Sequence, residues 1–406
     1  MASHSETSTD VVIVGGGLTG LTQALALTRA GLRAVVLDRA EPGTQRTDAF
    51  DGRVTSLAYG THSMLQRLGV WPALASEAEP ILDIRVSDGG MPFFLHFDHK
   101  DVGDRPFGFM VENRHLRRAL QDAVAAAGIT WLAPVEVASV ERGDVHAAVR
   151  LADGRRVRAP LVVSAEGRNS SLRREAGIRS LSWNYRQTAI VSTVAHELPH
   201  HGVAKEHFLP SGPFALLPMT DGRSSLVWTE RQDLAGAMLD LPQADFDAEI
   251  VARAGHHWGT MQSIGPRWSF PLGLHNAERY IDRRLVLIGD AAHAMHPIAG
   301  QGLNLGMRDV AALAEVLVDA ARLGLDIGSQ QVLQRYQEWR RFDALTMLLM
   351  TDGLNRLFSN RSSAIRIVRG LGLGMVNALP RAKHFFERRA AATSGDLPKL
   401  IRGVAL

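Results

Sequence analysis

Two histidines, His293 and His296, lie three residues apart in the stretch GDAAHAMHPIAGQGLNLGMRDV, residues 289–310. In a helix this spacing places both imidazoles on one face, where they could bind a metal ion. Pro297 and Gly300 follow at once, and both residue types break a helix. The sequence places no third ligand nearby. We therefore expect no metal site, and interpret the stretch as a glycine-rich turn that leads into a helix.

A second glycine cluster, a GxGxxG motif near the N-terminus, consists of Gly15, Gly17 and Gly20. It follows the apolar run VVIV and precedes a leucine-rich helical pattern over residues 21–29. In such motifs the glycines allow a tight turn, close approach of a diphosphate and helix packing, and the helix start carries about half a positive charge. Asp38 ends the next apolar run, where a carboxylate can accept a ribose hydrogen bond. The pattern predicts a dinucleotide site without distinguishing FAD from NAD.

The surrounding elements predict a sheet assembled from distant segments. Residues 114–127 have a helical apolar period, residues 147–158 form a hairpin pattern, and PLVVSAEG and RLVLI are typical of buried strands. Between them, residues 188–195 and 214–230 alternate like strands of a second sheet, with a turn at Asp221 and Gly222. Residues 329–386 are mostly helical in pattern.

Composition limits the classes of protein. A chain of 406 residues exceeds the ~250–300 residues of a single core, so we expect two lobes. The absence of cysteine excludes disulfides, thiolate metal sites and cysteine nucleophiles. The N-terminal segment lacks the pattern of a secretory signal, and no apolar run reaches the length of a membrane span. We expect a cytoplasmic protein.

Two segments then resemble the single-component flavin aromatic hydroxylases of the para-hydroxybenzoate hydroxylase type. AEGRNSSLR, residues 165–173, is similar to their DGxxSxxR signature with Glu166 in place of aspartate, and residues 289–310 are similar to their second FAD motif. The segments RQTAIVSTVAHELPHHGVAKEHFLPSGPFALLPM, SLVWTE, DGRVTSLAYG and GDLPKLIRG resemble the narrower family of ubiquinone-biosynthesis hydroxylases. The resemblance covers essentially the whole chain.

The expected fold class is α/β. We assign residues 1–75, 105–180 and 275–330 to an FAD-binding Rossmann-like domain, residues 76–104 and 181–274 to an inserted antiparallel sheet domain for the substrate, and residues 331–406 to a helical C-terminal region.

The resemblance implies an FAD site. Asp290 is expected to bind the ribityl chain, and Gly300 to Asn304 to surround the pyrimidine edge with backbone donors. Pro297, Gly300 and Gly302 are expected to position the flavin for catalysis, with no side-chain base assigned. Glu166 keeps the charge of the usual aspartate, so we expect a change in fine geometry more than in activity. For Arg114, surface charge or helix capping is an equally good interpretation. The full expected cofactor-binding set is Gly15, Gly17, Leu18, Thr19, Gly20, Asp38, Arg39, Arg53, Asn113, Arg114, Val137, Glu166, Gly289, Asp290, Pro297, Gly300, Gln301, Gly302, Leu303 and Asn304.

The implied reaction is hydroxylation of the aromatic ring of a polyprenylated phenol or quinol of ubiquinone biosynthesis. NAD(P)H would reduce FAD, dioxygen would add to the reduced flavin, and the flavin hydroperoxide would transfer one oxygen atom to the ring. The glycines of residues 370–374 follow no strand, so the NAD(P)H reductant is expected to bind only transiently. Two alternatives stay open. One is a hydroxylase of a small soluble aromatic compound, and the other is a non-catalytic escort protein for prenylated partners.

The substrate and partners follow from the same resemblance. A prenyl tail could lie against apolar residues of the second sheet, although core packing explains most of them equally well; these residues are Phe208, Phe214, Leu216, Leu217, Val227 and Trp228. Residues 361–406 carry nine Lys or Arg and two acidic residues. This segment, with its helical stretch over residues 365–376, could contact the inner face of the cytoplasmic membrane, pack in the core or form an oligomer. Other quinone-biosynthesis proteins are compatible partners, and nucleic acid is not expected because no recognition motif is present.

Overall fold

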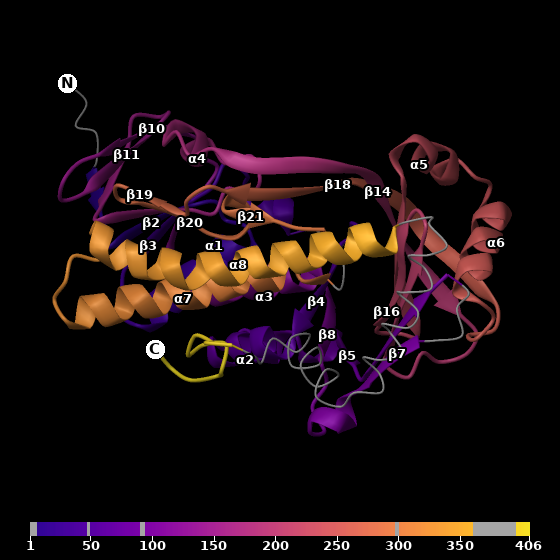
Figure 1. Ribbon diagram of the computed structural model, residues 1–406. Helices are drawn as coiled ribbons and strands as arrows, with labels where there is room; N and C mark the ends of the chain where they lie inside the picture. Colours follow the sequence, from indigo (N-terminus) through magenta and orange to yellow (C-terminus); the bar gives the residue numbers. More distant parts are fainter. Residues whose placement is uncertain (1–5, 47–48, 90–93, 297–299, 360–394) are drawn as a thin grey trace.

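The computed structural model describes residues 6–46, 49–89, 94–296, 300–359 and 395–406, and Figure 1 shows the arrangement of its elements. Pro297, the glycines of residues 370–374 and the helical stretch predicted over residues 365–376 lie outside the described residues. In the ranges that are described, no helix combines the length and apolar character needed to cross a bilayer.

A six-stranded sheet carries the GxGxxG motif directly after one of its inner strands. The runs VVIV and AVVL are buried along their whole length, as is typical of parallel strands covered on both faces. All neighbouring strands are parallel except β19 and β20. The spatial order is β19 (Ile281–Asp282), β20 (Leu285–Leu287), β13 (Leu161–Ser164), β2 (Val11–Val14), β3 (Ala34–Leu37) and β9 (Thr130–Leu132). Segments far apart in the chain therefore meet in one sheet, as predicted.

An eight-stranded sheet forms the second layer. It contains the predicted turn, where Asp221 and Gly222 have φ angles of 62° and 64°, a left-handed conformation that these residue types tolerate. Neighbouring strands are antiparallel except β15 and β6. The order is β21 (His293–Ala294), β18 (Met261–Ala277), β14 (Ser180–His196), β17 (Arg223–Arg231), β16 (Gly212–Met219), β15 (Val203–Leu209), β6 (Asp83–Asp88) and β7 (Phe94–Asp98). The long strands β14 and β18 extend from this sheet back toward the first one (Figure 1).

One face of the eight-stranded sheet is covered by two helices, α5 (Gln232–Leu239) and α6 (Gln243–Ala254). Phe214, Leu216 and Trp228 lie in the buried core beneath these helices. Core packing, the alternative left open by the sequence, therefore accounts for these three residues. Successive side chains of a strand point to opposite sides, so the residues between these core positions lie on the opposite face of the sheet.

Two long helices, α7 (Gly302–Arg322) and α8 (Gln330–Phe358), lie side by side along the molecule (Figure 1). Arg340 of α8 binds Asp309 of α7 through a buried ion pair of 2.8 Å between Nε and Oδ1. At its far end α8 reaches the eight-stranded sheet, where Phe358 stacks on Phe208 with 4.3 Å between ring centroids. The helix α8 thus connects the two layers.

The remaining elements are short. The predicted hairpin is found as β11 and β12, and the predicted helix over residues 114–127 is found one residue earlier as α3. A four-stranded sheet contains β1 (Glu6–Ser8), β12 (Arg156–Ala159), β11 (Ala147–Leu151) and β10 (Val137–Arg142), and a three-stranded sheet contains β4 (Val54–Ala58), β8 (Gly108–Glu112) and β5 (Ala78–Ile81). The other helices are α1 (Leu18–Arg29), α2 (Tyr59–Arg67), α3 (Asn113–Ala126) and α4 (Ser171–Glu175), and the 3-10 turns are Pro42–Gln45, Trp71–Ala73, Ala75–Glu77, His99–Val102 and Gly289–Ala291. The predicted α/β fold with a second sheet and a helical region is confirmed, and the domain boundaries stay a prediction.

Candidate active site

A cavity of about 1070 Å³ opens at the carboxyl ends of strands in the six-stranded sheet and extends to the eight-stranded sheet. Ligands of open α/β sheets bind at this edge, and the volume is slightly above the ~300–1,000 Å³ typical of small-molecule sites. The predicted residues that line the cavity are Gly15, Gly17, Leu18, Thr19, Asp38, Arg39, Arg53, Asn113, Val137, Glu166, Asp290, Gly300, Gly302 and Leu303. Those that do not line it are Gly20, Arg114, Gly289, Gln301 and Asn304.

The three glycines of the GxGxxG motif have different surroundings. A Cβ atom on Gly15, which has a φ of +110°, would lie 2.4 Å from the carbonyl oxygen of Ala165. A Cβ on Gly20 would lie 1.9 Å from the carbonyl oxygen of Gly15, so Gly20 serves the packing of α1 rather than the cavity wall. A Cβ on Gly17 would meet no protein atom within 4 Å. The backbone at Gly17 is therefore open to a ligand at the positive end of α1.

Asp38 lies beside this turn at the end of β3. Its Oδ1 accepts a hydrogen bond from the backbone N–H of Ala40 at 2.8 Å, and its Oδ2 accepts one from Gly16. Both bonds fix the carboxylate at the cavity wall next to the first helix. The position supports the predicted ribose contact.

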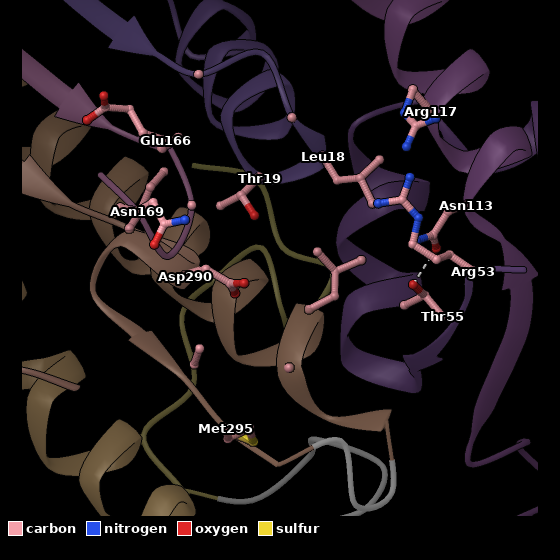
Figure 2. A pocket seen from close by; sticks show the side chains of 18 of the residues that line it. Leu18, Thr19, Arg53, Thr55, Asn113, Arg117, Glu166, Asn169, Asp290 and Met295 are labelled. Atoms are coloured by element: carbon pink, nitrogen blue, oxygen red, sulfur yellow. Dashed lines mark hydrogen bonds between the residues drawn. The ribbon is translucent and has the colours of Figure 1, made fainter. Parts of the chain in front are cut away.

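Two guanidinium groups, those of Arg53 and Arg117, lie on one wall of the cavity (Figure 2). Arg53 is paired with Asp51 at 2.6 Å between Nη2 and Oδ2. Burial, and then repulsion by Arg53, lowers the pKa of the Arg117 guanidinium below its ordinary value. An anionic ligand such as a diphosphate would offset this repulsion. Arg117 was not predicted from the sequence.

Asn113 and Arg114, both predicted at the cofactor, point in different directions from the first turn of α3. Asn113 lines the cavity and its Oδ1 accepts a hydrogen bond from Thr55 (Figure 2). Arg117 lies four residues later and shares that face of the helix. Arg114 points elsewhere, because its Nε donates to Glu112 Oε2 at 2.6 Å. The structure therefore does not bring Arg114 to the cavity, and the helical period would have selected Arg117 instead.

Glu166 lies at the cavity edge, but its carboxylate binds the start of α4. It accepts hydrogen bonds from Ser170 Oγ at 2.6 Å, from the Leu172 N–H at 3.1 Å and from both the N–H and the hydroxyl of Ser171. A carboxylate at a helix N-terminus is stabilised by the free N–H groups there. Glu166 thus fixes the turn after β13, and its extra methylene group is accommodated by this cap.

The glycine-rich loop after β20 supplies the middle of the cavity. The Asp290 carboxylate is exposed on the cavity wall, below Thr19 in Figure 2, and desolvation by the surrounding protein raises its pKa. Gly300 has a φ of +62°, and a Cβ there would lie 2.9 Å from the Cβ of Ser56. Gly302 begins α7, and a Cβ there would meet no protein atom within 4 Å. The N-terminal backbone of α7 is therefore open to the cavity.

Asn304, expected at the cofactor, instead holds α7 against the three-stranded sheet. Its Oδ1 accepts hydrogen bonds from the Ala58 N–H at 2.9 Å and from Thr61 Oγ1 at 2.8 Å, and its Nδ2 donates to the carbonyl oxygen of Ser56 at 2.7 Å. Both polar atoms of its side chain are therefore used inside the protein. This side chain fixes the start of α7, and the backbone contact predicted for Asn304 stays a prediction.

The two histidines of the opening motif have separate surroundings. His293 Nε2 lies 2.7 Å from Asp309 Oδ2, which also accepts the N–H of Gly289 at 2.9 Å. Burial opposes the charge of Asp309, but His293 and Arg340 hold its pKa below the usual value. His296 lies at the cavity wall and contacts the Tyr185 ring at 5.3 Å between centroids. Within the described ranges, no three His, Cys, Asp or Glu side chains are grouped to hold a metal ion.

The far end of the cavity is formed by the second face of the eight-stranded sheet. Of the apolar residues proposed from the sequence, Leu217 and Val227 line it. The sequence did not single out the others, which are Glu206, Pro213, Ala215 and Thr229. Period-two alternation could have separated the two faces, since the wall residues of these strands, Pro213, Ala215 and Leu217 of β16 and Val227 and Thr229 of β17, lie two positions apart.

The cavity residues fit FAD. Gly17 and Gly302 leave open backbone where a Cβ would project, and the Arg53 and Arg117 guanidinium groups suit a diphosphate. Asp38 and Asp290 offer carboxylates for ribose and ribityl hydroxyls. The far end, at the eight-stranded sheet, combines apolar residues with Glu206 and Thr229.

Comparisons with known proteins identify the family and the fold. The sequence model of the FAD binding domain family matches residues 8–348. The chain is 48% identical over 401 residues to the ubiquinone hydroxylase UbiL of Rhodospirillum rubrum, covering 98% of this chain and 93% of that protein. It is 35% identical over 368 residues to the 3-demethoxyubiquinol 3-hydroxylase of Escherichia coli, covering 90% and 94%. The p-nitrophenol 4-monooxygenase PnpA of Pseudomonas putida shares the fold, with a TM-score of 0.79 at 20% identity over 97% of this chain and 100% of that one.

Proposed function

Because this chain belongs to the FAD-dependent aromatic hydroxylases, the family of the ubiquinone hydroxylases, we propose that it hydroxylates a polyprenylated phenol or quinol of ubiquinone biosynthesis. The substrate is the aromatic ring, the reductant is NAD(P)H and the oxygen comes from dioxygen. The observation that carries the proposal is a continuous cavity that joins the dinucleotide fingerprint at Gly17 to the apolar wall at Leu217 and Val227.

FAD supplies the redox and oxygen-transfer chemistry when it is bound. The protein binds and orients it. Gly17 and the N-terminus of α1 lie where a diphosphate fits, with Arg53 and Arg117 as its counter-charges. Asp290 would accept hydrogen bonds from the ribityl hydroxyls, and the start of α7 at Gly302 would offer backbone N–H groups to the flavin ring. Donors fixed in advance around developing negative charge are usually a large part of catalysis.

The second sheet excludes water from the reacting ring. Pro213, Ala215, Leu217 and Val227 present apolar surface to the cavity. Burying a prenyl tail on such a surface contributes about 0.8 kcal/mol per methylene. A long tail therefore binds more tightly than a short soluble aromatic compound, which favours the lipid substrate over that alternative.

Contact with a membrane surface is the second part of the proposal. Phe342 and Leu349 of α8 are 78% and 60% exposed and lie seven residues apart, on the same side of the helix as the exposed Leu345. This apolar stripe precedes the basic segment of residues 361–406 in the chain. Apolar side chains followed by basic residues suit the anionic inner face of the cytoplasmic membrane.

The test of the reaction uses purified protein with FAD and NADPH. Product is measured by mass spectrometry on a prenylated phenol and on the same phenol without its tail. We expect higher kcat/KM on the prenylated compound. Equal turnover of the short compound favours the soluble-aromatic alternative, and a colourless protein that cannot be reconstituted with FAD favours the escort alternative.

The membrane contact is tested by sedimentation with vesicles. We expect binding to vesicles that contain anionic lipid and weaker binding by a Phe342→Ser, Leu349→Ser variant. Unchanged binding of this variant contradicts the role given to α8. The alternatives, an oligomer interface or a contact with other quinone-biosynthesis proteins, then explain the stripe better.

A further inference from the structure

His296 and Thr229 share an unusual property. Both side chains are buried, at 0% and 1% exposure, and both line the cavity. In the part of the chain that the structure describes, neither ring nitrogen of His296 makes a hydrogen bond, and Thr229 Oγ1 makes none either. Buried polar groups are nearly always hydrogen-bonded, because an unpaired one loses its hydration without compensation. These two groups therefore point to a partner that the protein itself does not supply.

The two residues come from different walls of the cavity. His296 follows β21 in the glycine-rich loop, and Thr229 lies on β17 in the middle of the eight-stranded sheet. The apolar wall residues Val227 and Ala215 lie near Thr229 in the same sheet, since Ala215 pairs with Val227. The polar pair thus lies where the flavin loop meets the apolar substrate wall.

The chemistry of the pair suits an oxygen atom on an aromatic ring. Burial lowers the pKa of His296 to about 4, so its imidazole is neutral near pH 7 and offers one donor and one acceptor. A threonine hydroxyl offers both roles as well. Tyr185 orients the imidazole by edge contact, and its own hydroxyl donates to Asp352 at 3.0 Å. Side chains at binding sites commonly adjust their rotamers when a ligand binds, so either group can turn toward a ring oxygen.

We propose that His296 and Thr229 bind the oxygen substituents of the substrate's aromatic ring, and so fix which ring carbon faces the flavin. The inference rests on the proposed function, because it requires a phenolic ligand in the cavity. It assigns the hydrogen-bonding partners of the ring to two residues from different elements of the cavity wall. It gives His296 a role different from that of its neighbour His293, which is paired with Asp309.

The test measures ligand binding by the holoenzyme through the change in FAD absorbance. The probes are 2-prenylphenol and prenylbenzene, which differ by the hydroxyl group alone. We expect the wild type to prefer the phenol. Thr229→Val and His296→Leu remove the polar groups with little change in volume, and each should reduce this preference about three- to tenfold, the range of one neutral hydrogen bond. Thr229→Ser and His296→Asn keep a donor and an acceptor and should retain most of it.

Thr193 provides a matched control. Its hydroxyl is also buried without a partner among the described residues and lies in the same sheet, but it does not line the cavity. Thr193→Val should leave the phenol preference unchanged. Thr193→Val, Thr229→Val and His296→Leu should all melt at the wild-type temperature or above it, because each removes an unpaired buried polar group.

The outcomes separate the inference from the proposed function. A wild type without phenol preference, or apolar variants at positions 229 and 296 that keep the preference, overturns the inference while the hydroxylase function stands. A lower melting temperature of Thr229→Val and His296→Leu also overturns it, because these side chains would then be structural. Failure of the wild-type protein to bind FAD, or to bind either probe, overturns the proposed function itself.

Discussion

Replacing Arg340 by methionine tests how the protein holds its glycine-rich loop. Arg340 and Asp309 are 2% and 0% exposed, and their side chains form an ion pair of 2.8 Å. Asp309 also accepts the N–H of Gly289, directly before Asp290 in the cavity wall. The substitution leaves the Asp309 carboxylate buried, with the His293 ring and the Gly289 N–H as its remaining close partners.

The expected loss of unfolding free energy is about 4 kcal/mol. Removing one partner of a buried ion pair costs about 3–5 kcal/mol of unfolding free energy, because the other charge stays buried without compensation. Arg340 also pairs with Asp343, but Asp343 keeps Arg308 at 3.1 Å, so the larger part of the loss is expected at the fully buried Asp309. Since whole domains are stable by about 5–15 kcal/mol, the variant should fold with a small margin.

Urea unfolding at pH 7, followed by tryptophan fluorescence, measures the loss, and flavin fluorescence measures FAD affinity. We expect weaker FAD binding, because the Gly289 turn loosens. In the double variant Arg340→Met, Asp309→Asn the amide carries no charge, so more than half of the stability should return. A loss below about 1 kcal/mol in the single variant, or a double variant less stable than the single one, refutes the reasoning.

Three further predictions concern the cofactor end and the ion network. Gly17→Ala should weaken FAD binding about tenfold without lowering the melting temperature of the FAD-free protein. Gly20→Ala should lower that melting temperature, because its Cβ would lie 1.9 Å from the Gly15 carbonyl oxygen. A Gly17→Ala variant with wild-type FAD affinity would contradict the inference that the backbone at Gly17 is open to the ligand. Arg117→Met should weaken FAD binding and reduce its dependence on salt, measured by titration at two ionic strengths, and an unchanged salt dependence would exclude a phosphate contact. Burial opposes the charge of Asp343, but Arg340 and Arg308 lower its pKa to about 2 from an unfolded value of 3.8. The ionised carboxylate therefore stabilises the protein by about 2 kcal/mol above pH ~4. This contribution disappears as the pH falls toward about 2. Urea unfolding of the wild type and Asp343→Asn across this range should show the difference shrink in acid, and a constant difference would argue against the pair.

Local sequence patterns determined the fold class and the family. The runs VVIV and AVVL, the spacing of Gly15, Gly17 and Gly20 and the hairpin over residues 147–158 all act within a few residues. A buried strand, a glycine turn and a helix start are set by such short-range chemistry. The three motifs and their order led to the flavin hydroxylases, and the family comparisons confirm that resemblance.

The tertiary structure decided which side chains meet. Arg117 rather than Arg114 faces the cavity, because α3 packs with its Asn113 face inward and Arg114 binds Glu112. Glu166 caps a helix, a role that depends on the turn after β13 bringing the start of α4 to its carboxylate. Residue types and the apolar periodicity of helices and strands can be obtained from the sequence. Which face of a helix or strand is covered by distant parts of the chain depends on the tertiary structure.

The motif HAMH, residues 293–296, is an example of side chains whose surroundings could not be predicted from the sequence. His293 and His296 are close in sequence and of one type, so no local pattern separates them. Their environments differ because α7 brings Asp309 against His293, whereas β14 brings Tyr185 against His296 at the cavity wall. These long-range contacts place an acidic partner beside the first histidine, whereas the second has no hydrogen bond within the described part of the chain.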